Sequence, residues 1–208
     1  MKESLHAYMR VGIVHFMAWP STIKGEGPIL ETVRRIAVDD YFDAIELTWI
    51  KDATVRAQVG KLAGCAKLAV GYGGQPRLLT TGLNINDLDE EGRLKAVATL
   101  KEGIDEAYEL GAAGFAYLSG KYAEETKEAS YQALLKSTRE LCAYAASKGS
   151  MPVNLEVFDY DIDKKSLIGP TSLAERFARE VRKDHENFGL LVDRSEERRV
   201  GKECRSRW

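Results

Sequence analysis

Short apolar segments alternate with longer segments of helical periodicity along most of the chain. The apolar segments have the length of β-strands and cover residues 10–17, 43–49, 67–73, 114–118, 151–159 and 188–193. Between them, apolar residues recur every three or four positions, which predicts a helix after each of the first five segments. Strands that alternate with helices in this way are typical of a parallel sheet, so the pattern predicts an α/β fold.

Two of the predicted helices carry recognisable capping residues. Asp89 is suited to cap the longest helix, and acidic residues follow it in the first turn, where the helix dipole favours negative charge. Gly111 is expected to end that helix. Ser172 and Glu175 have the spacing of a capping box and predict the start of the last helix.

Two architectures contain a sheet of this kind, the doubly wound open sheet and the (β/α)8 barrel. The first strand is not followed by G-x-G-x-x-G, and the sequence has no phosphate-binding P-loop, which disfavours a nucleotide-binding open sheet. In a barrel, the site is shared among the loops that follow the strands. The residues of chemical interest do follow several different strands: His15, Glu46, Gln75, Arg77, Lys121, Glu156 and Asp193. The fold predicted is therefore of the (β/α)8 TIM-barrel type.

Two of the predicted strands end in carboxylates. The segment MPVNLEVFD, residues 151–159, carries Glu156 and Asp159, and FGLLVD ends at Asp193. Parallel strands deliver their carboxyl ends to one edge of a sheet, so Glu156 and Asp193 are expected to point into the same mouth. Such a carboxylate pair is able to hold a hard or borderline divalent ion through oxygen ligands.

Each candidate residue also has a structural interpretation. Glu156 is either functional or a buried acid paired with a structural arginine, and function is favoured because a carboxylate that ends an apolar strand needs a partner. Asp193 is either a ligand or an N-cap, and Glu46 either lines the site or pairs with a cation. His15 is more often a hydrogen-bonded core residue than a catalyst. Four cationic residues either bind substrate oxygens or are solvated: Arg77, Lys121, Lys164 and Lys165.

Composition narrows the class of protein. The length of 208 residues suits one domain, and contents of 44% hydrophobic and 30% charged residues are those of a soluble globular protein. A formal net charge of −2 offers no basic field for nucleic acid. No signal peptide or membrane-spanning segment is recognisable. Cys65, Cys142 and Cys204 lack metal-ligand spacing and are interpreted as reduced thiols of a cytoplasmic protein.

The composition changes abruptly after Asp193. The stretch RSEERRVGKECRSRW, residues 194–208, has no periodicity and is dense in arginine. It is either a basic arm for nucleic acid or membrane, or a foreign tail. The foreign origin is favoured, because the whole stretch reads as the translation of a common short-read sequencing adapter. We therefore expect residues 1–193 to be an incomplete barrel that lacks its last two βα units, since a complete one typically needs about 250 residues.

The motifs VGIVHFMAWP, FDAIELTW, YELGAAGFAYLSG, NLEVFD and GLLVD occur in this order over about residues 10–193. Together they resemble the xylose-isomerase-like TIM barrels, the family of the sugar phosphate isomerases and epimerases. The resemblance implies a divalent metal (Mn, Mg, Co or Zn) at the carboxyl-terminal mouth of the barrel. It implies that Glu156 is both a ligand and the catalytic base, and that Asp193 is a ligand. The substrate would be a sugar or sugar phosphate, converted through an enediolate, with substrate-binding residues among His15, Glu46, Gln75, Arg77 and Lys121.

The resemblance also implies two ligands that the chain does not contain, a histidine after strand seven and a glutamate after strand eight. We therefore expect the chain to be an inactive fragment. Two other functions stay open, a metal-dependent hydrolase similar to endonuclease IV and a non-catalytic barrel that binds metal or sugar. The small number of histidines disfavours the first, because those enzymes need many histidine ligands. Unpaired edges on strands one and six would favour a homo-oligomer.

Overall fold

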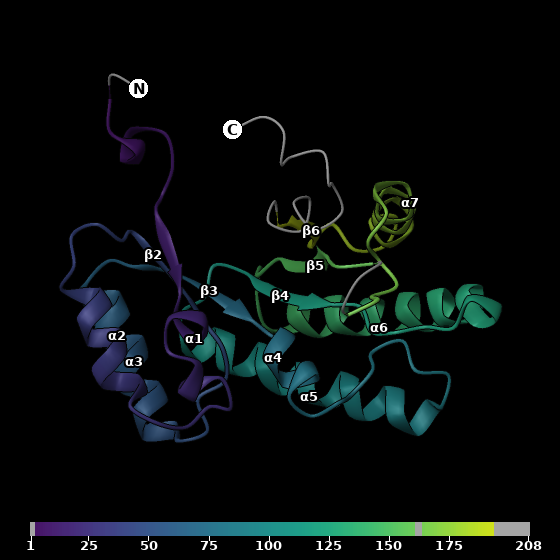
Figure 1. The fold of residues 1–208 in the computed structure, drawn as a ribbon, viewed down its shortest axis with the longest axis horizontal. Coiled ribbons are helices and arrows are strands. Elements are labelled where there is room, and N and C mark those ends of the chain that lie inside the picture. Colours follow the sequence, from purple (N-terminus) through teal and green to yellow (C-terminus); the bar gives the residue numbers. More distant parts are fainter. Residues whose placement is uncertain (1–2, 161–163, 194–208) are drawn as a thin grey trace, which may run out of the picture.

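The computed structural model of the chain describes residues 3–160 and 164–193. Within these residues, six parallel strands form one sheet whose spatial order follows the sequence (Figure 1). The strands are β1 (Gly12–Val14), β2 (Ala44–Leu47), β3 (Ala69–Gly73), β4 (Phe115–Leu118), β5 (Val153–Val157) and β6 (Phe188–Val192). The arrangement confirms the predicted α/β fold of (β/α)8 type. The prediction of a non-native tail concerns residues 194–208, which lie outside the described part of the chain.

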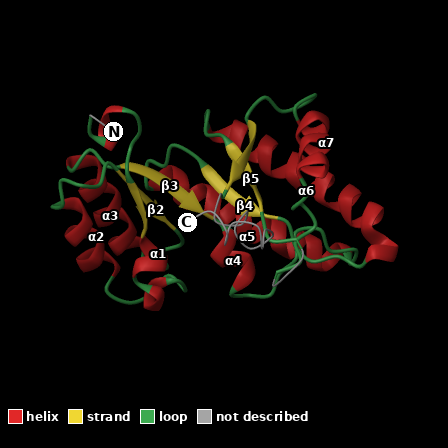
Figure 2. Cartoon of the chain, turned by 45° about the horizontal axis from the view of Figure 1, so that its top comes forward, coloured by secondary structure: helices red, strands yellow, loops and turns green. Residues whose placement is uncertain are grey.

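Helices connect the successive strands. They are α1 (His15–Ala18), α2 (Ile29–Ala37), α3 (Ala53–Cys65), α4 (Gln75–Leu79), α5 (Glu90–Glu109), α6 (Lys127–Lys148) and α7 (Thr171–Val181). Three short 3-10 helices accompany them: η1 (Leu5–Ala7), η2 (Pro20–Thr22) and η3 (Glu124–Thr126). Figures 1 and 2 show α2, α3, α5 and α6 along one side of the strands, with α7 beside the end of the sheet that carries β6. None of these helices is long and apolar enough to cross a membrane.

The main hydrophobic core lies between the sheet and the helices. Successive side chains of a strand point to opposite faces. In β2, Ile45 and Leu47 are buried in the core cluster, whereas Ala44 and Glu46 lie on the other face and are half-buried. The core face of the other strands is likewise apolar and buried: Val70, Tyr72, Phe115, Tyr117, Val153 and Leu155. The opposite face is therefore the one on which polar side chains can lie.

The loops that follow β3, β4 and β5 are hydrogen-bonded to one another. The Asn86 side chain accepts a hydrogen bond from the backbone N–H of Gly120 (2.6 Å) and donates one to the Lys121 carbonyl (2.9 Å). The backbone N–H of Ile168 donates to the Ser119 hydroxyl at 2.8 Å. Because all three loops leave the carboxyl ends of strands, these bonds fix the rim on one side of the mouth.

Several predicted boundaries are wrong, each for a local reason. The first strand ends at Val14 rather than residue 17, because α1 begins at His15. The loop predicted after β3 contains the short helix α4, whose second residue is a proline, suited to a first turn. Ser172 does not cap α7: the helix begins at Thr171, Pro170 occupies the N-cap position, and no side chain caps it.

Other boundaries are confirmed. The Asp89 side chain accepts a hydrogen bond from the backbone N–H of Gly92 and caps α5, as predicted. Gly111, directly after the C-cap of that helix, has a φ of 68°, a left-handed conformation that glycine adopts without strain. β1 and β6 pair with one neighbour each within the described residues, so they are the edges of the sheet.

A stability measurement distinguishes Asp89, which caps a helix, from Ser172, which does not. We predict that Asp89→Ala lowers the free energy of unfolding by about 1 kcal/mol, because α5 loses its cap. Ser172→Ala is the matched control and should change the free energy by less than about 0.5 kcal/mol, since that hydroxyl is exposed and caps nothing. Urea denaturation followed by circular dichroism measures both, and equal effects of the two variants would contradict the assignment.

Candidate functional site

The carboxyl ends of β2, β3 and β5 bring polar side chains together around Gly73, the last residue of β3. The Gln75 side chain donates a hydrogen bond from Nε2 to Oε2 of Glu156, at 2.9 Å. A Cβ at Gly73 would lie 2.7 Å from Oε1 of Glu46 and 2.9 Å from Oε1 of Gln75. The Phe16 ring lies 3.4 Å from the same point. Three of the predicted site residues are therefore assembled in one place, with an aromatic ring beside them.

Glu156 lies on β5 with only 7% of its surface exposed. It stands in register with Leu118 of β4 and Leu191 of β6, so apolar residues flank it on both neighbouring strands. A carboxylate in such surroundings requires hydrogen-bond donors. The Gln75 amide supplies one of them, where the sequence had suggested a structural arginine as the alternative.

Glu46 and Asp193 are close enough to influence each other electrostatically. Burial raises the pKa of the Glu46 carboxyl, and the charge of Asp193 raises it further. Asp193 directly follows β6, and Glu46 lies on β2, so the two carboxylates approach across the inner face of the sheet. Two negative charges therefore lie near each other at the inner face, an arrangement that a cation would stabilise.

The contacts of His15 are those of a structural residue. The side chain is 2% exposed, and its Nε2 lies 2.7 Å from the Thr32 hydroxyl of α2. That hydroxyl donates its proton to the Pro28 carbonyl at 2.9 Å, so the imidazole N–H is the donor to Thr32. Burial lowers the pKa of His15 to about 4, and the ring packs against Trp19 with centroids 5.4 Å apart. His15 is therefore neutral at pH 7.

Arg77 faces the helix layer. Its Nε donates to the Tyr72 hydroxyl at 3.0 Å, and its Nη2 pairs with Glu106 of α5 at 2.8 Å. The guanidinium also lies 5.1 Å from the centre of the Trp49 ring. These contacts, with 2% exposure of the residue, fasten α4 to α5. The structure therefore separates Arg77 from the cluster around Gly73.

Lys121 lies in the rim loop after β4. Its backbone forms an antiparallel bridge with Ser166 and accepts the amides of Asn84 and Asn86, both at 2.9 Å. The residue itself is exposed. Lys121 thus holds the rim through its main chain, beside the mouth rather than among the buried polar groups.

The rim also contains an aromatic and cationic cluster that the sequence reasoning missed. The rings of Tyr122 and Tyr160 stack with centroids 5.9 Å apart, and Lys127 donates a hydrogen bond to the Tyr160 hydroxyl at 2.8 Å. This bond is the main reason why the pKa of Tyr160 is lowered. Aromatic residues shortly after two strand ends were the available sequence signal. Gly73 and Phe16 were also missed, and only the tertiary contacts reveal them.

The chemistry of the assembled groups suits a hard divalent cation. The donors are oxygens of carboxylates and a carboxamide, and Oε1 of Gln75 is buried without a hydrogen-bond partner. Among the described residues, no three histidine, cysteine, aspartate or glutamate side chains converge closely enough to form a complete ligand set. The oxygen groups assembled at Gly73 therefore have the chemistry of ligands for such a cation, of which they would supply a part of the coordination.

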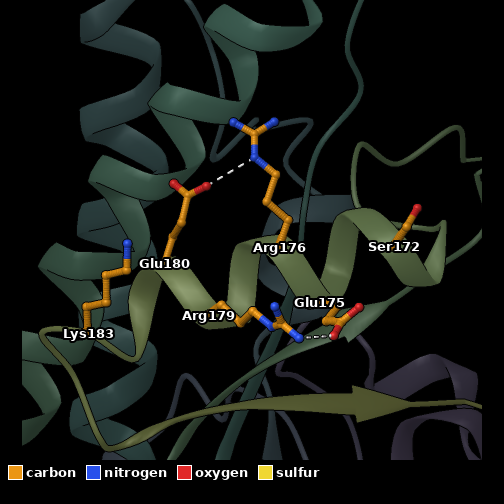
Figure 3. Close-up of a pocket in the computed structure, with 6 residues that line it drawn as sticks. All are labelled: Ser172, Glu175, Arg176, Arg179, Glu180 and Lys183. Carbon is orange, nitrogen blue, oxygen red and sulfur yellow. Dashed lines mark hydrogen bonds and ion pairs between the residues drawn. The ribbon is translucent and has the colours of Figure 1, made fainter.

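A hollow on the surface of α7 is a different feature. It is lined by Ser172, Glu175, Arg176, Arg179, Glu180 and Lys183 (Figure 3). Arg179 pairs with Glu175 at 2.7 Å and Arg176 with Glu180 at 3.0 Å, so these charges neutralise each other. The opposite face of α7 packs into the core. The hollow therefore faces away from the mouth and does not extend the site.

Comparisons with known proteins agree with this architecture. The sequence profile of the xylose isomerase-like TIM barrel family matches residues 35–196. A search of curated protein sequences finds no significant match. Among solved structures, the chain is similar to a D-tagatose 3-epimerase-like protein, with a TM-score of 0.73 and 17% identity over 93% of this chain and 68% of that one.

Two further structures illustrate the breadth of the similarity. One is an AP endonuclease of family 2 from Brucella melitensis, with a TM-score of 0.72 and 16% identity over 95% of this chain and 74% of that one. The other is a xylose isomerase-like TIM barrel protein from Mycobacterium smegmatis in complex with magnesium. The TM-score is 0.58, and the identity is 19% over 83% of this chain and 59% of that one. At these identities the similarity establishes the fold. The chain spans between 59% and 74% of the length of the three structures.

We predict that His15 makes the fold sensitive to mild acid. Its pKa is about 4 in the folded chain and about 6.5 when unfolded, so the unfolded state binds more protons between these values and stability falls as pH falls from 7 to 4.5. The loss attributable to His15 is about 2 kcal/mol. Chemical denaturation at pH 8, 7, 5.5 and 4.5 should show a shallower pH dependence for His15→Gln than for the wild type. If stability depends on pH equally in the two proteins, the lowered pKa of the buried His15 is contradicted.

We predict that Arg77 is needed for stability. Arg77→Met should lower the free energy of unfolding by about 3 kcal/mol, because Glu106 loses a buried partner. Combining it with Glu106→Gln should restore part of the loss, since the stranded charge is removed. Arg35→Met, which breaks an exposed pair with Glu31, is the control and should cost less than about 0.5 kcal/mol. An Arg77→Met protein as stable as the control would return Arg77 to the list of substrate-binding candidates.

Proposed function

Because the chain belongs to the xylose isomerase-like TIM barrel family, we propose that it carries part of the site of a metal-dependent isomerase or epimerase of sugars or sugar phosphates. The observation that carries the proposal is the assembly of Glu46, Gln75 and Glu156 at the carboxyl ends of parallel strands, with Asp193 beside Glu46. In barrels of this type, the strand ends on this side form the active site. The similarity to a D-tagatose 3-epimerase-like protein supports the class of reaction.

Within this proposal, Glu156 and Asp193 hold a divalent cation whose identity is left among Mn, Mg, Co and Zn. The magnesium complex of a structurally similar barrel supports a cation of this kind. When bound, the cation stabilises the negative charge that develops on the substrate oxygens during enolisation. Glu156 removes the proton from the carbon next to the carbonyl group, and the electron pair of that C–H bond forms the enediolate. Return of a proton to a different carbon or face gives the isomer or epimer.

Two other functions fit parts of the structure less well. A hydrolase of abasic DNA would follow the similarity to an AP endonuclease of family 2, but such a site needs histidine ligands. His6 bonds Asp43 before β2, His15 bonds Thr32, and His185 precedes β6, so none lies among the assembled carboxylates. A barrel that binds metal or sugar without catalysis remains the second alternative, and it would show binding without proton exchange.

The partner of the site is a small molecule, a sugar or sugar phosphate, and the acidic balance of the chain gives no support for nucleic acid. We place the protein in the cytoplasm, because Cys65 and Cys142 are free thiols. Within the described residues, β1 and β6 each have one edge without a neighbouring strand, and such edges favour self-association into a homo-oligomer. We also propose that this chain alone does not turn over sugar, because the family resemblance implies four metal ligands and the described residues bring no three such side chains together.

Metal binding tests the proposal directly. We predict that the purified chain binds Mn²⁺ and that Glu156→Gln and Asp193→Asn each weaken the affinity at least about tenfold, because each removes a charged ligand. Glu175→Gln on the exposed face of α7 is the control and should bind Mn²⁺ as the wild type does. Isothermal titration calorimetry and the electron paramagnetic resonance of free Mn²⁺ measure the affinities.

An absence of Mn²⁺ binding, or binding that survives both substitutions, would reject the site. The claim that the chain alone is inactive has a separate test. Incubation with Mn²⁺ and D-tagatose in D₂O should leave the sugar unlabelled and unconverted. Turnover that disappears in Glu156→Gln would overturn the inactivity and strengthen the proposed reaction.

A further inference from the structure

Gln75 occupies a position that its sequence context does not explain. It is the first residue of α4, directly after the end of β3, and only 8% of its surface is exposed. Its partner Glu156 lies on β5, so the side chain reaches past β4 to the second strand along. A buried glutamine that crosses a strand to contact a carboxylate has given up solvent on both polar atoms, and this burial is costly unless both atoms are used.

The orientation of the Gln75 amide follows from its partner. The Gln75 NH₂ group donates to Oε2 of Glu156, and a carboxylate oxygen accepts this bond. The amide must therefore present its NH₂ group to Glu156, and its oxygen must point the other way. Oε1 of Gln75 is buried there and has no hydrogen-bond partner. An acceptor of this kind, aimed into a polar space, requires a donor from elsewhere.

Oε1 of Gln75 can lie this close to the end of β3 because residue 73 is glycine. Oε1 of Gln75 and Oε1 of Glu46 are both within 3 Å of the point where a Cβ would stand, at 2.9 and 2.7 Å. The edge of the Phe16 ring closes the same region at 3.4 Å. Two hydrogen-bond acceptors next to an aromatic ring suit a group that offers O–H donors and an apolar C–H face, and a sugar offers both.

We propose that Gln75 is a positioning and specificity-determining residue: its NH₂ group holds the Glu156 carboxylate in place, and its Oε1 accepts a hydrogen bond from one hydroxyl group of a ketose. The inference rests on the proposed function, because it takes Glu156 as the carboxylate that acts on the sugar. Gln75 acts on the reaction through Glu156 and contacts only a non-reacting hydroxyl. A site built around such a bond rejects ligands that lack the hydroxyl, because the amide oxygen would stay buried and unpaired.

The positioning role is tested without a sugar. Gln75→Met keeps the shape of the side chain and removes both polar atoms, so Glu156 loses a donor, and the affinity for Mn²⁺ should fall about tenfold. Gln132→Met is the matched control, since the Gln132 amide donates to Glu128 at the same distance, 2.9 Å, on the exposed surface. The control should bind Mn²⁺ as the wild type does.

The specificity role is tested by a double-mutant cycle between protein and ligand. The probes are D-tagatose and its monodeoxy analogues, titrated in the presence of Mn²⁺ and followed by NMR. In the wild type, one analogue should bind about tenfold more weakly than D-tagatose, and in Gln75→Met the two should bind equally. Gly73→Ala places a methyl group against Oε1 of Gln75 and Oε1 of Glu46 and should weaken D-tagatose binding as well.

Two results would overturn the inference, and they are distinguishable from each other. If the wild type binds Mn²⁺ and D-tagatose but Gln75→Met retains both affinities and the same ranking of analogues, the role of Gln75 is wrong and the proposed function stands. If the wild type binds neither probe, the proposed function fails and the inference fails with it. The melting temperature of Gln75→Met is measured as a control. If it equals that of the wild type, a changed affinity reports on the site and not on a damaged fold.

Discussion

The hydrogen bond between Gln75 and Glu156 is the interaction on which the site depends. It joins the ends of β3 and β5 across β4, at 2.9 Å, and it gives a buried carboxylate one of the donors that burial requires. Without the parallel register of β3, β4 and β5, these two side chains would not meet. Without the bond, a negative charge would lie among Leu118 and Leu191 with one donor fewer. The fold and the candidate chemistry are thus linked at one contact.

The two faces of the sheet differ in polarity. This difference explains why the site is polar although the fold has a well-packed apolar core. The face toward the helices carries large apolar residues, and the buried Arg77 there is paired with Glu106. The inner face carries small residues with Glu46 and Glu156 among them. Gly73 is needed on this face because any side chain would collide with the oxygens of Glu46 and Gln75. Glycine at this position therefore lets the polar groups of Glu46 and Gln75 gather at the end of β3.

The candidates separate according to what their side chains contact. Glu46, Gln75 and Glu156 meet around Gly73, and the charge of Asp193 acts on Glu46. His15 and Arg77 follow strand ends in the sequence but turn toward α2 and α5. A position near the end of a strand is therefore not sufficient to make a residue part of the site. Lys121 belongs to the rim, where Tyr122, Lys127 and Tyr160 add an aromatic surface beside the mouth.

The sequence by itself determined the succession of strands and helices, because hydrophobic periodicity and caps such as Asp89 are local properties. It also determined that Glu156 and Asp193 end parallel strands, since strand direction follows from the alternation with helices. The Ser172 cap and the extended first strand were wrong because Pro170 and His15 begin helices in ways that composition did not reveal. Only the tertiary structure decided that Gln75 bonds Glu156, that the oxygens of Glu46 and Gln75 approach the backbone of Gly73, and that Arg77 turns away. These contacts join residues up to 81 positions apart, and no local pattern encodes such a distance.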